Sequence, residues 1–358
     1  MKKILISTGG SGGHVIPALT VFEHLKDKFE VYLVSDKRGT KFIEKNLFKF
    51  KIIDVPNIYS NLLKLPINIL FFSFAIIKSI IFIKKNKIEI LFSTGGYMSL
   101  PLCIASWILN LNIILFEPNM VIGRANKLIF KFCKKILCYQ NQIINLPEKY
   151  RNKVFITPPL LRKEIYSLDK NLNKKIVEPI KIIVLGGSQG AKFFDEQVKD
   201  LIINLSKFYK IHLTQQIYDE NKIDELKIIY NKKNIENILF NYSKNLYKKF
   251  NSFDLAITRS GATAISELSH FNIPFIAVPF PHAKDNHQFY NAKYYSDKNC
   301  CWLINQNDFE IQKISVFIKN LIDNQTDYFK KKENLNKNSY QNTWNNINEK
   351  LVKLIYEN

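Results

Sequence analysis

Two apolar segments in the second half of the chain each lead into side chains that could bind a sugar nucleotide. Residues 255–258 precede the small-residue turn Ser260-Gly261-Ala262, and residues 275–278 precede a proline-rich loop. Glu267 follows the turn, and its carboxylate could accept hydrogen bonds from a vicinal diol. The loop adds groups suited to hydroxyls and amides, namely His282, Asp285, Asn286, His287, Gln288 and Asn291. The pattern indicates a sugar-nucleotide pocket, although an ordinary strand and helix with a polar loop would give the same residue pattern.

A glycine-rich loop, TGGSGGH at residues 8–14, follows an apolar strand at residues 3–7 and precedes a helical pattern from Pro17 to about Lys26. Strand, glycine turn and helix form a common phosphate-binding device. A dinucleotide site is one alternative, since Asp36 closes the next strand, but Val15 replaces the third glycine of that motif. A P-loop is excluded by the spacing. His14 is a candidate general base because an imidazole exchanges protons near neutrality.

A second strand–glycine–helix unit begins at residues 181–185 and continues as GGSQGA at residues 186–191. Ser188 and the N–H groups of this turn are suited to a pyrophosphate. Lys192 suggests a P-loop, but the glycine spacing is one residue short. The repeated unit predicts two similar lobes.

Strands and helices alternate along both halves, which predicts α/β lobes with parallel, doubly wound sheets. The expected strands are residues 3–7, 31–34, 51–55, 90–93, 112–116, 136–139, 181–185, 210–214, 237–240, 255–258, 275–278 and 302–304. We expect an N-terminal lobe at 1–160 and a C-terminal lobe at 161–339. The apolar stripe of the last helix, within 340–358, would return to the first lobe.

Six ordered motifs resemble the MurG family of glycosyltransferases. They are GGSGGH at 9–14, TGGYMS at 94–99, FEPN at 116–119, PPLLR at 158–162, GGSQGA at 186–191 and RSGATAISE at 259–267 with HQ at 287–288. The resemblance implies a GT-B fold of two Rossmann-like lobes with a cleft between them. It implies an inverting transfer of GlcNAc from UDP-GlcNAc to the muramyl 4-hydroxyl of lipid I, which yields lipid II in peptidoglycan synthesis.

By the same resemblance, His14 or Glu117 is the catalytic base, and the donor occupies mainly the C-terminal lobe without a metal or an organic cofactor. The departing diphosphate would be met by the Ser188 loop, the helix after Gly261, and Arg259 or Arg162. The implied UDP-GlcNAc contacts are Ser11, Gly12, Gly13, Asn119, Arg162, Ser188, Ser243, Ala262, Thr263, Ala264, Ile265, Ser266, Glu267 and Gln288. The chain departs from the family pattern at Phe116, Pro118, Thr157-Pro158 and Ala264, where Thr263 could supply the missing hydroxyl.

An apolar segment at residues 62–85 could contact a membrane. Its core, residues 65–83, is long enough to cross a bilayer, but Pro66 and Lys78 interrupt it. A helix lying on the cytoplasmic face of the inner membrane is favoured, since the polyprenyl acceptor resides there. Phe71, Phe72, Ile76 and Ile80 would meet lipid, and Lys64, Lys78, Lys84, Lys85 and Lys87 would meet anionic headgroups. A fully buried helix is the alternative.

The composition fits a folded cytoplasmic protein with an anionic partner. The chain has 358 residues, a net charge of +21 at pH 7 and a pI near 9.5. Its five cysteines lack C-x-x-C or zinc spacing, and no secretory signal follows Met1. A UDP-GlcNAc 2-epimerase would share the fold but needs no lipid-binding segment. A nucleic-acid-binding protein would cluster its basic residues, whereas the lysines here are spread along the chain.

Overall fold

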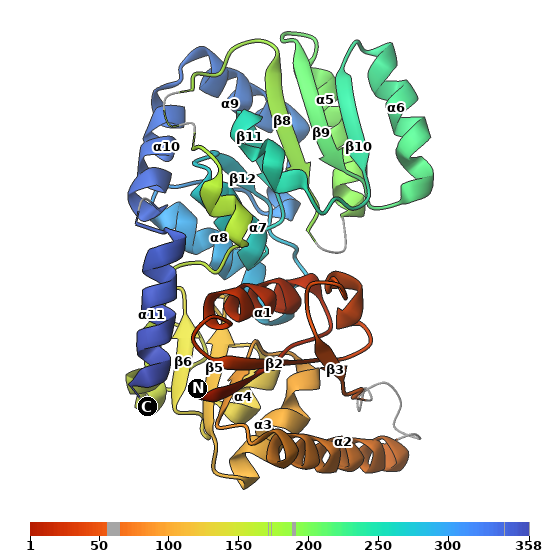
Figure 1. The fold of residues 1–358 in the computed structure, drawn as a ribbon. Coiled ribbons are helices and arrows are strands. Elements are labelled where there is room, and N and C mark those ends of the chain that lie inside the picture. The colour runs from red at the N-terminus through yellow and green to blue at the C-terminus, as the bar shows by residue number, and fades with distance from the viewer. Residues whose placement is uncertain (56–64, 171, 173, 188–190, 340, 358) are drawn as a thin grey trace. The chain divides into compact units, whose positions relative to one another are not determined.

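The computed structural model describes residues 1–55, 65–170, 172, 174–187, 191–339 and 341–357. Within these ranges the chain forms two compact units, Met1–Tyr166 with Thr343–Asn358, and Ser167–Asn342. Each unit is built on a parallel sheet flanked by helices (Figure 1). The sequence-based division at residues 160 and 340 lies a few residues before these boundaries, so residues 161–166 belong to the first unit.

The first unit has a seven-stranded sheet in the order β3-β2-β1-β4-β5-β6-β7, and every neighbouring pair is parallel. The strands are β1 (Lys3–Ser7), β2 (Glu30–Ser35), β3 (Phe50–Ile52), β4 (Ile90–Ser93), β5 (Asn112–Glu117), β6 (Lys135–Cys138) and β7 (Val154–Ile156). The helices are α1 (Gly12–Leu25), α2 (Leu65–Asn86), α3 (Leu100–Ile108), α4 (Arg124–Ile129) and α11 (Trp344–Tyr356). The sequence analysis missed β7 and extended β3 to residue 55.

The alternation of side chains along β1 assigns the two faces of this sheet. Ile4 and Ile6 point into a core shared with α1 and α11, whereas Leu5 points into a core shared with α2 and α3. All three side chains are fully buried. A strand covered on both faces is expected for a parallel sheet, and it explains why the strand sequences are continuously apolar.

The second unit has a six-stranded parallel sheet in the order β10-β9-β8-β11-β12-β13. The strands are β8 (Ile180–Leu185), β9 (Ile211–Gln216), β10 (Glu236–Phe240), β11 (Leu255–Thr258), β12 (Phe275–Ala277) and β13 (Trp302–Leu303). The helices are α5 (Lys199–Leu205), α6 (Ile223–Lys232), α7 (Ala262–His270), α8 (His287–Asp297), α9 (Ile311–Asp323) and α10 (Thr326–Ser339). The predicted parallel, doubly wound architecture is confirmed in both units.

The C-terminal helix α11 packs on α1 through a stacked pair of rings. His24 is 2% exposed, and its ring centroid lies 3.5 Å from that of Trp344 with an interplanar angle of 17°. Burial, with a smaller effect from Lys163, lowers the pKa of His24 to about 3. The folded protein therefore keeps this imidazole neutral where an unfolded chain would protonate it.

We expect His24 to make the first unit less stable in mild acid. The neutral imidazole costs no stability above the unfolded pKa of about 6.5, and the cost grows as the pH falls toward 3. The free energy of unfolding is therefore expected to drop by about 2 kcal/mol at pH 5. Urea unfolding of wild type and His24→Phe at pH 7.5 and pH 5 checks this, because phenylalanine keeps the stacking without a titratable group. An equal loss of stability in both proteins at pH 5 would contradict the prediction.

Candidate active site

In both units the strand order reverses direction at one point, between β1 and β4 in the first and between β8 and β11 in the second. Ligands of doubly wound sheets bind beyond the carboxyl ends of the strands at such a point. Residues 8–11 and 94–96 follow these strands in the first unit, and residues 186–187 and 259–261 follow them in the second, where 188–190 lie outside the described residues. Four of the predicted motifs therefore lie at the two positions where this fold binds ligands.

His14 joins the two loops of the first unit. Its Nδ1 lies 2.8 Å from the carbonyl oxygen of Thr94, and a carbonyl can only accept, so Nδ1 carries the proton. In the neutral imidazole the lone pair is then on Nε2. A Cβ built on Gly96 would lie 3.4 Å from the ring, so glycine at 96 lets the second loop approach it closely. The arrangement presents Nε2 as a proton acceptor.

α1 begins at Gly12, earlier than the predicted start at Pro17. Pro17 lies inside the helix, where it lacks the N–H that would bond to the carbonyl of Gly13. The prediction was wrong because proline is tolerated in the early turns of a helix when packing holds it. His14 consequently sits in the first turn of α1, next to the partial positive charge of the helix N-terminus.

Glu117 lies at the end of β5 and is 2% exposed. Its Oε1 accepts from the backbone and side-chain N–H groups of Asn119 at 3.2 and 3.0 Å. Its Oε2 accepts from Gly123 N at 2.7 Å and Asn126 Nδ2 at 3.0 Å. Four hydrogen bonds to a buried carboxylate stabilise the charged form and hold the loop 117–126 in place. This geometry makes Glu117 a loop anchor and favours His14 as the base.

In the second unit, Gln216 ties together the loops that follow three strands. Its Nε2 donates to Gly187 O at 2.9 Å and to Asn241 O at 3.1 Å. Gly187 has φ +82°, a conformation that glycine adopts without strain. Ser188 lies outside the described residues, and Ser243 is exposed on the loop after β10.

Arg259 does not serve as the predicted contact for a departing diphosphate. It is 4% exposed, and its Nη1 donates to the carbonyl oxygens of Val278 and Pro279 at 3.0 Å each. Its Nη2 donates to Gln306 Oε1, and its guanidinium packs on the rings of Phe193, Phe194 and Phe280. Burial lowers the pKa of Arg259 to about 10. The side chain fastens the loop after β12 to the end of β11, because its Nη1 bonds both of these carbonyls.

The predicted donor contacts at 262–267 form the first turns of α7, directly after β11. Ile265 and Ser266 are buried, whereas Ala262, Thr263, Ala264 and Glu267 are half-buried. Asn291 Nδ2 donates to Ser260 O at 3.1 Å, which joins α8 to the turn before α7. Gln288 Oε1 accepts from Phe280 N at 3.0 Å, so its carboxamide lies against the loop after β12. The segments 259–267 and 278–291 thus form one connected surface.

The remaining predicted residues lie on both units. Ser11, Gly12 and Gly13 lie with His14 at the start of α1, and Asn119 is held by Glu117. Arg162 is half-buried and belongs to the first unit. Sequence reasoning missed Asn126 and Gln216, whose side chains order the loops. The sequence signal for such residues was a polar side chain that follows a glycine or acidic motif by a few positions, or one that ends a buried strand.

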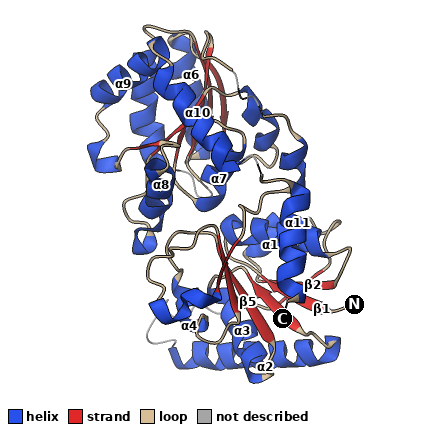
Figure 2. Cartoon of the chain, turned by 90° about the vertical axis from the view of Figure 1, so that its left-hand side faces the viewer, coloured by secondary structure: helices blue, strands red, loops and turns tan. Residues whose placement is uncertain are grey.

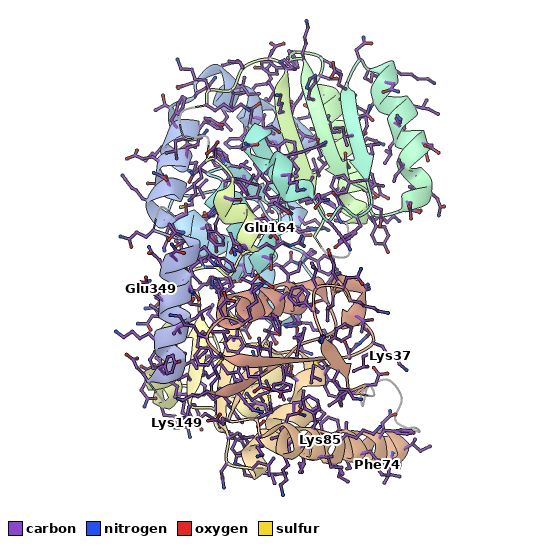
Figure 3. The ribbon with its side chains drawn as sticks, in the orientation of Figure 1. Lys37, Phe74, Lys85, Lys149, Glu164 and Glu349 are labelled. Carbon is purple, nitrogen blue, oxygen red and sulfur yellow. The ribbon has the colours of Figure 1, made fainter. Side chains whose placement is uncertain are left out.

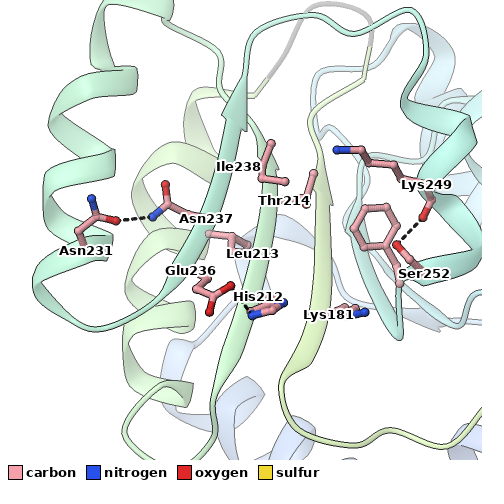
Figure 4. A pocket seen from close by; sticks show the side chains of 11 residues that line it. Lys181, His212, Leu213, Thr214, Asn231, Glu236, Asn237, Ile238, Lys249 and Ser252 are labelled. Carbon is pink, nitrogen blue, oxygen red and sulfur yellow. Dashed lines mark hydrogen bonds and ion pairs between the residues drawn. The ribbon is translucent and has the colours of Figure 1, made fainter.

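A groove of about 450 Å³ lies elsewhere in the second unit and holds none of the predicted contacts (Figure 4). It is lined by Lys181, His212, Thr214, Glu236, Ile238 and Lys249, with an ion pair between His212 and Glu236. Lys181, His212 and Glu236 are the first or second residues of their strands, so the groove lies toward the amino ends. Ligand sites of this fold lie at the carboxyl ends, and we therefore assign the site to the loops described above.

The chain matches two family models, the glycosyltransferase family 28 N-terminal domain over residues 4–138 and the corresponding C-terminal domain over residues 181–347. A Pelagibacter ubique protein called UDP-N-acetylglucosamine–N-acetylmuramyl-(pentapeptide) pyrophosphoryl-undecaprenol N-acetylglucosamine transferase is 48% identical, covering 100% of this chain and 99% of that protein. A Rickettsia bellii protein of the same name is 35% identical, covering 90% and 92%.

Solved structures support the fold. Acinetobacter baumannii MurG superimposes with a TM-score of 0.77 at 20% identity, covering 99% of this chain and 100% of that one. A Neisseria meningitidis UDP-GlcNAc 2-epimerase superimposes with a TM-score of 0.68 at 12% identity, covering 99% and 100%. Structural similarity alone therefore does not separate transferases from epimerases.

Proposed function

The chain belongs to the MurG family within glycosyltransferase family 28, and from this premise we propose that it transfers GlcNAc from UDP-GlcNAc to lipid I, forming lipid II for peptidoglycan. The observation that carries the proposal is the 48% identity to a transferase of that name over the whole chain. The sequence relatives favour the transferase over the 2-epimerase, which resembles the chain in fold alone.

The muramyl 4-hydroxyl oxygen attacks the anomeric carbon of GlcNAc as the bond from that carbon to the UDP oxygen breaks. His14 Nε2 accepts the hydroxyl proton, and its tautomer is set by the Thr94 carbonyl. UDP leaves with the bonding electron pair, and inversion follows from the single displacement. The N–H groups of Gly186 and Gly187 after β8 and the N-terminus of α7 stabilise the charge on the leaving diphosphate.

The decisive test offers the purified protein UDP-GlcNAc labelled in the sugar and a lipid I analogue. We expect a lipid-linked disaccharide and free UDP in equal amounts. Conversion of UDP-GlcNAc to its 2-epimer without any disaccharide would replace this proposal with the epimerase.

The membrane surface is contacted by the outer face of α2. Exposed apolar side chains recur along this helix at helical spacing, namely Ile67, Leu70, Phe71, Phe74, Ile77 and Ile81. Trp107 and Ile108 at the end of α3 are also about half exposed. α3 packs beside α2 (Figure 2). The exposed lysines on or just after α2 are Lys78, Lys84, Lys85 and Lys87, and Figure 3 labels Phe74 and Lys85. An apolar surface bordered by lysines suits an anionic bilayer.

Three of the expected lipid contacts were predicted wrongly, because they face the core. Phe72, Ile76 and Ile80 are partly buried against the core of the first unit, because they lie on the opposite side of α2 from Phe74 and Ile77. Lys64 lies outside the described residues. α2 is long and apolar enough to cross a membrane by length and composition alone. Ala75, Ser79 and Ile83 are buried in the unit, so a crossing would expose them, and a helix lying along the surface keeps this packing.

Replacing Phe74 and Ile77 together with serine is expected to weaken binding to anionic phospholipid vesicles about 100-fold, since each apolar side chain contributes about 1.5 kcal/mol on burial. Phe208→Ser is the matched control, because Phe208 is 54% exposed in the second unit. Vesicle co-sedimentation gives the affinities. Equal binding by the double variant and the wild type would show that α2 does not contact the membrane.

A further inference from the structure

Asp36, directly after β2, carries a carboxylate that points into the first unit. It is 2% exposed, and its Oδ1 accepts from the N–H groups of Gly10 and Gly39 at 2.8 Å each. Its Oδ2 accepts from Arg38 Nε at 2.7 Å. One oxygen thus holds two separate loops, the glycine loop after β1 and the turn after β2.

The two loops pack around this carboxylate without spare room. A Cβ on Gly9 would lie 2.5 Å from Asp36 Oδ1 and 2.6 Å from Met98 Cγ. A Cβ on Gly39 would lie 2.9 Å from the Cα of Gly9. Gly10 has φ +75°, a left-handed conformation in which its N–H is directed at the carboxylate. The shape of the loop therefore depends on an acceptor at residue 36.

An acidic residue at this position of a nucleotide-binding fold often binds the hydroxyls of a ribose. Here Oδ1 accepts from two backbone N–H groups, and Oδ2 accepts from the exposed side chain of Arg38. The carboxylate is directed at the protein's own loops, which removes the dinucleotide interpretation. Asp36 therefore binds Gly10, in the loop that leads to the proposed base His14.

The loop is anchored at three places, and Asp36 provides the middle one. Thr8 N donates to Val34 O at 3.0 Å, Gly10 N donates to Asp36, and the ring of His14 donates to Thr94 O. Ser11, Gly12 and Gly13 lie between the second and third anchors. Without the middle anchor, the start of α1 and the ring of His14 lose their support on one side.

We propose that Asp36 is a positioning residue for the transfer reaction, which holds the glycine loop so that the first turn of α1 presents His14 to the acceptor hydroxyl. The inference rests on the proposed function and extends it to a residue outside the family motifs quoted above. Both carboxylate oxygens of Asp36 are bonded to protein groups, so Asp36 acts through Gly10.

The test compares Asp36→Ala with Asp36→Asn. Alanine removes the acceptor and should lower kcat about 10- to 100-fold, in line with the effect of misplacing a catalytic group. Asparagine should restore activity to within about threefold, because its side-chain oxygen can still accept from both N–H groups. Activity is measured well below the melting temperature of each variant, so that loss of folded protein does not count as loss of kcat.

Asp54→Ala is the matched control. Asp54 also holds the turn after β2, through Lys37 N at 3.0 Å and Lys37 Nζ at 3.0 Å, but makes no hydrogen bond to the glycine loop among the described residues. Wild-type activity is expected for this variant. Equal losses of kcat in Asp54→Ala and Asp36→Ala would show that Asp36 contributes only to general stability.

Amide hydrogen exchange supplies a readout that does not depend on the reaction. Protection of Gly10 should be lost in Asp36→Ala and kept in Asp36→Asn and Asp54→Ala. Gly39 N also donates to the backbone carbonyl oxygen of residue 36 at 3.2 Å, which every variant keeps. Protection unchanged in Asp36→Ala, or lost protection with normal kcat, overturns the positioning role. A wild type that transfers no sugar would instead refute the proposed function, and the exchange result would still decide whether Asp36 holds the loop.

Discussion

Replacing His14 with alanine is expected to lower kcat about 10²- to 10⁴-fold, the usual contribution of a general base, while the KM for UDP-GlcNAc changes less than about threefold. The reason is the geometry of the ring. Nδ1 is committed to the Thr94 carbonyl, so Nε2 is the proton acceptor. Removing the ring removes an interaction made mainly in the transition state.

The measurement is steady-state transfer to a lipid I analogue, with kcat and KM determined for the wild type and His14→Ala. His212→Ala is the matched control, because His212 lies in the groove of the second unit and is paired with Glu236. A normal kcat in His14→Ala would move the base function to another group, with Glu117 the first to test.

Replacing Glu267 with alanine is expected to raise the KM for UDP-GlcNAc about 10- to 100-fold, since two charge-assisted hydrogen bonds to ribose hydroxyls contribute about 1.5 kcal/mol each. kcat should stay within about threefold of wild type, because the ribose is remote from the reacting carbon. Glu267 is half-buried in the second turn of α7, beyond the carboxyl end of β11, where the fold binds its ligands.

A donor lacking the ribose 2′-hydroxyl makes this test specific. The wild type should bind the deoxy donor more weakly than UDP-GlcNAc, whereas Glu267→Ala should treat the two donors alike. Glu225→Ala is the control, since Glu225 is an exposed carboxylate in the first turn of α6. If Glu267→Ala still discriminates between the two donors, the ribose contact belongs to another residue.

The strands, their parallel order and the loops of the site could be predicted from the sequence. Continuous apolar runs such as residues 90–93 and 255–258 indicate strands buried on both faces, and glycine turns after them indicate ligand loops. The motif resemblance extended these local signals to a family, and the relatives confirmed it. The short edge strand β7 was missed because three residues carry too little periodicity.

The role of each polar side chain was decided by tertiary structure. The sequence analysis treated Glu117 and Arg259 as groups that act on the substrate, but both are buried. Glu117 is bonded to the loop that follows it, and Arg259 is bonded to the loop after β12. It also could not tell which face of α2 meets the core, since an almost uniformly apolar helix has no clear polar side. The residue types at the site were determined by the sequence. Whether a side chain meets the substrate or holds a loop depended on which strand ends the fold brings together, because hydrogen bonds act only over a few ångströms.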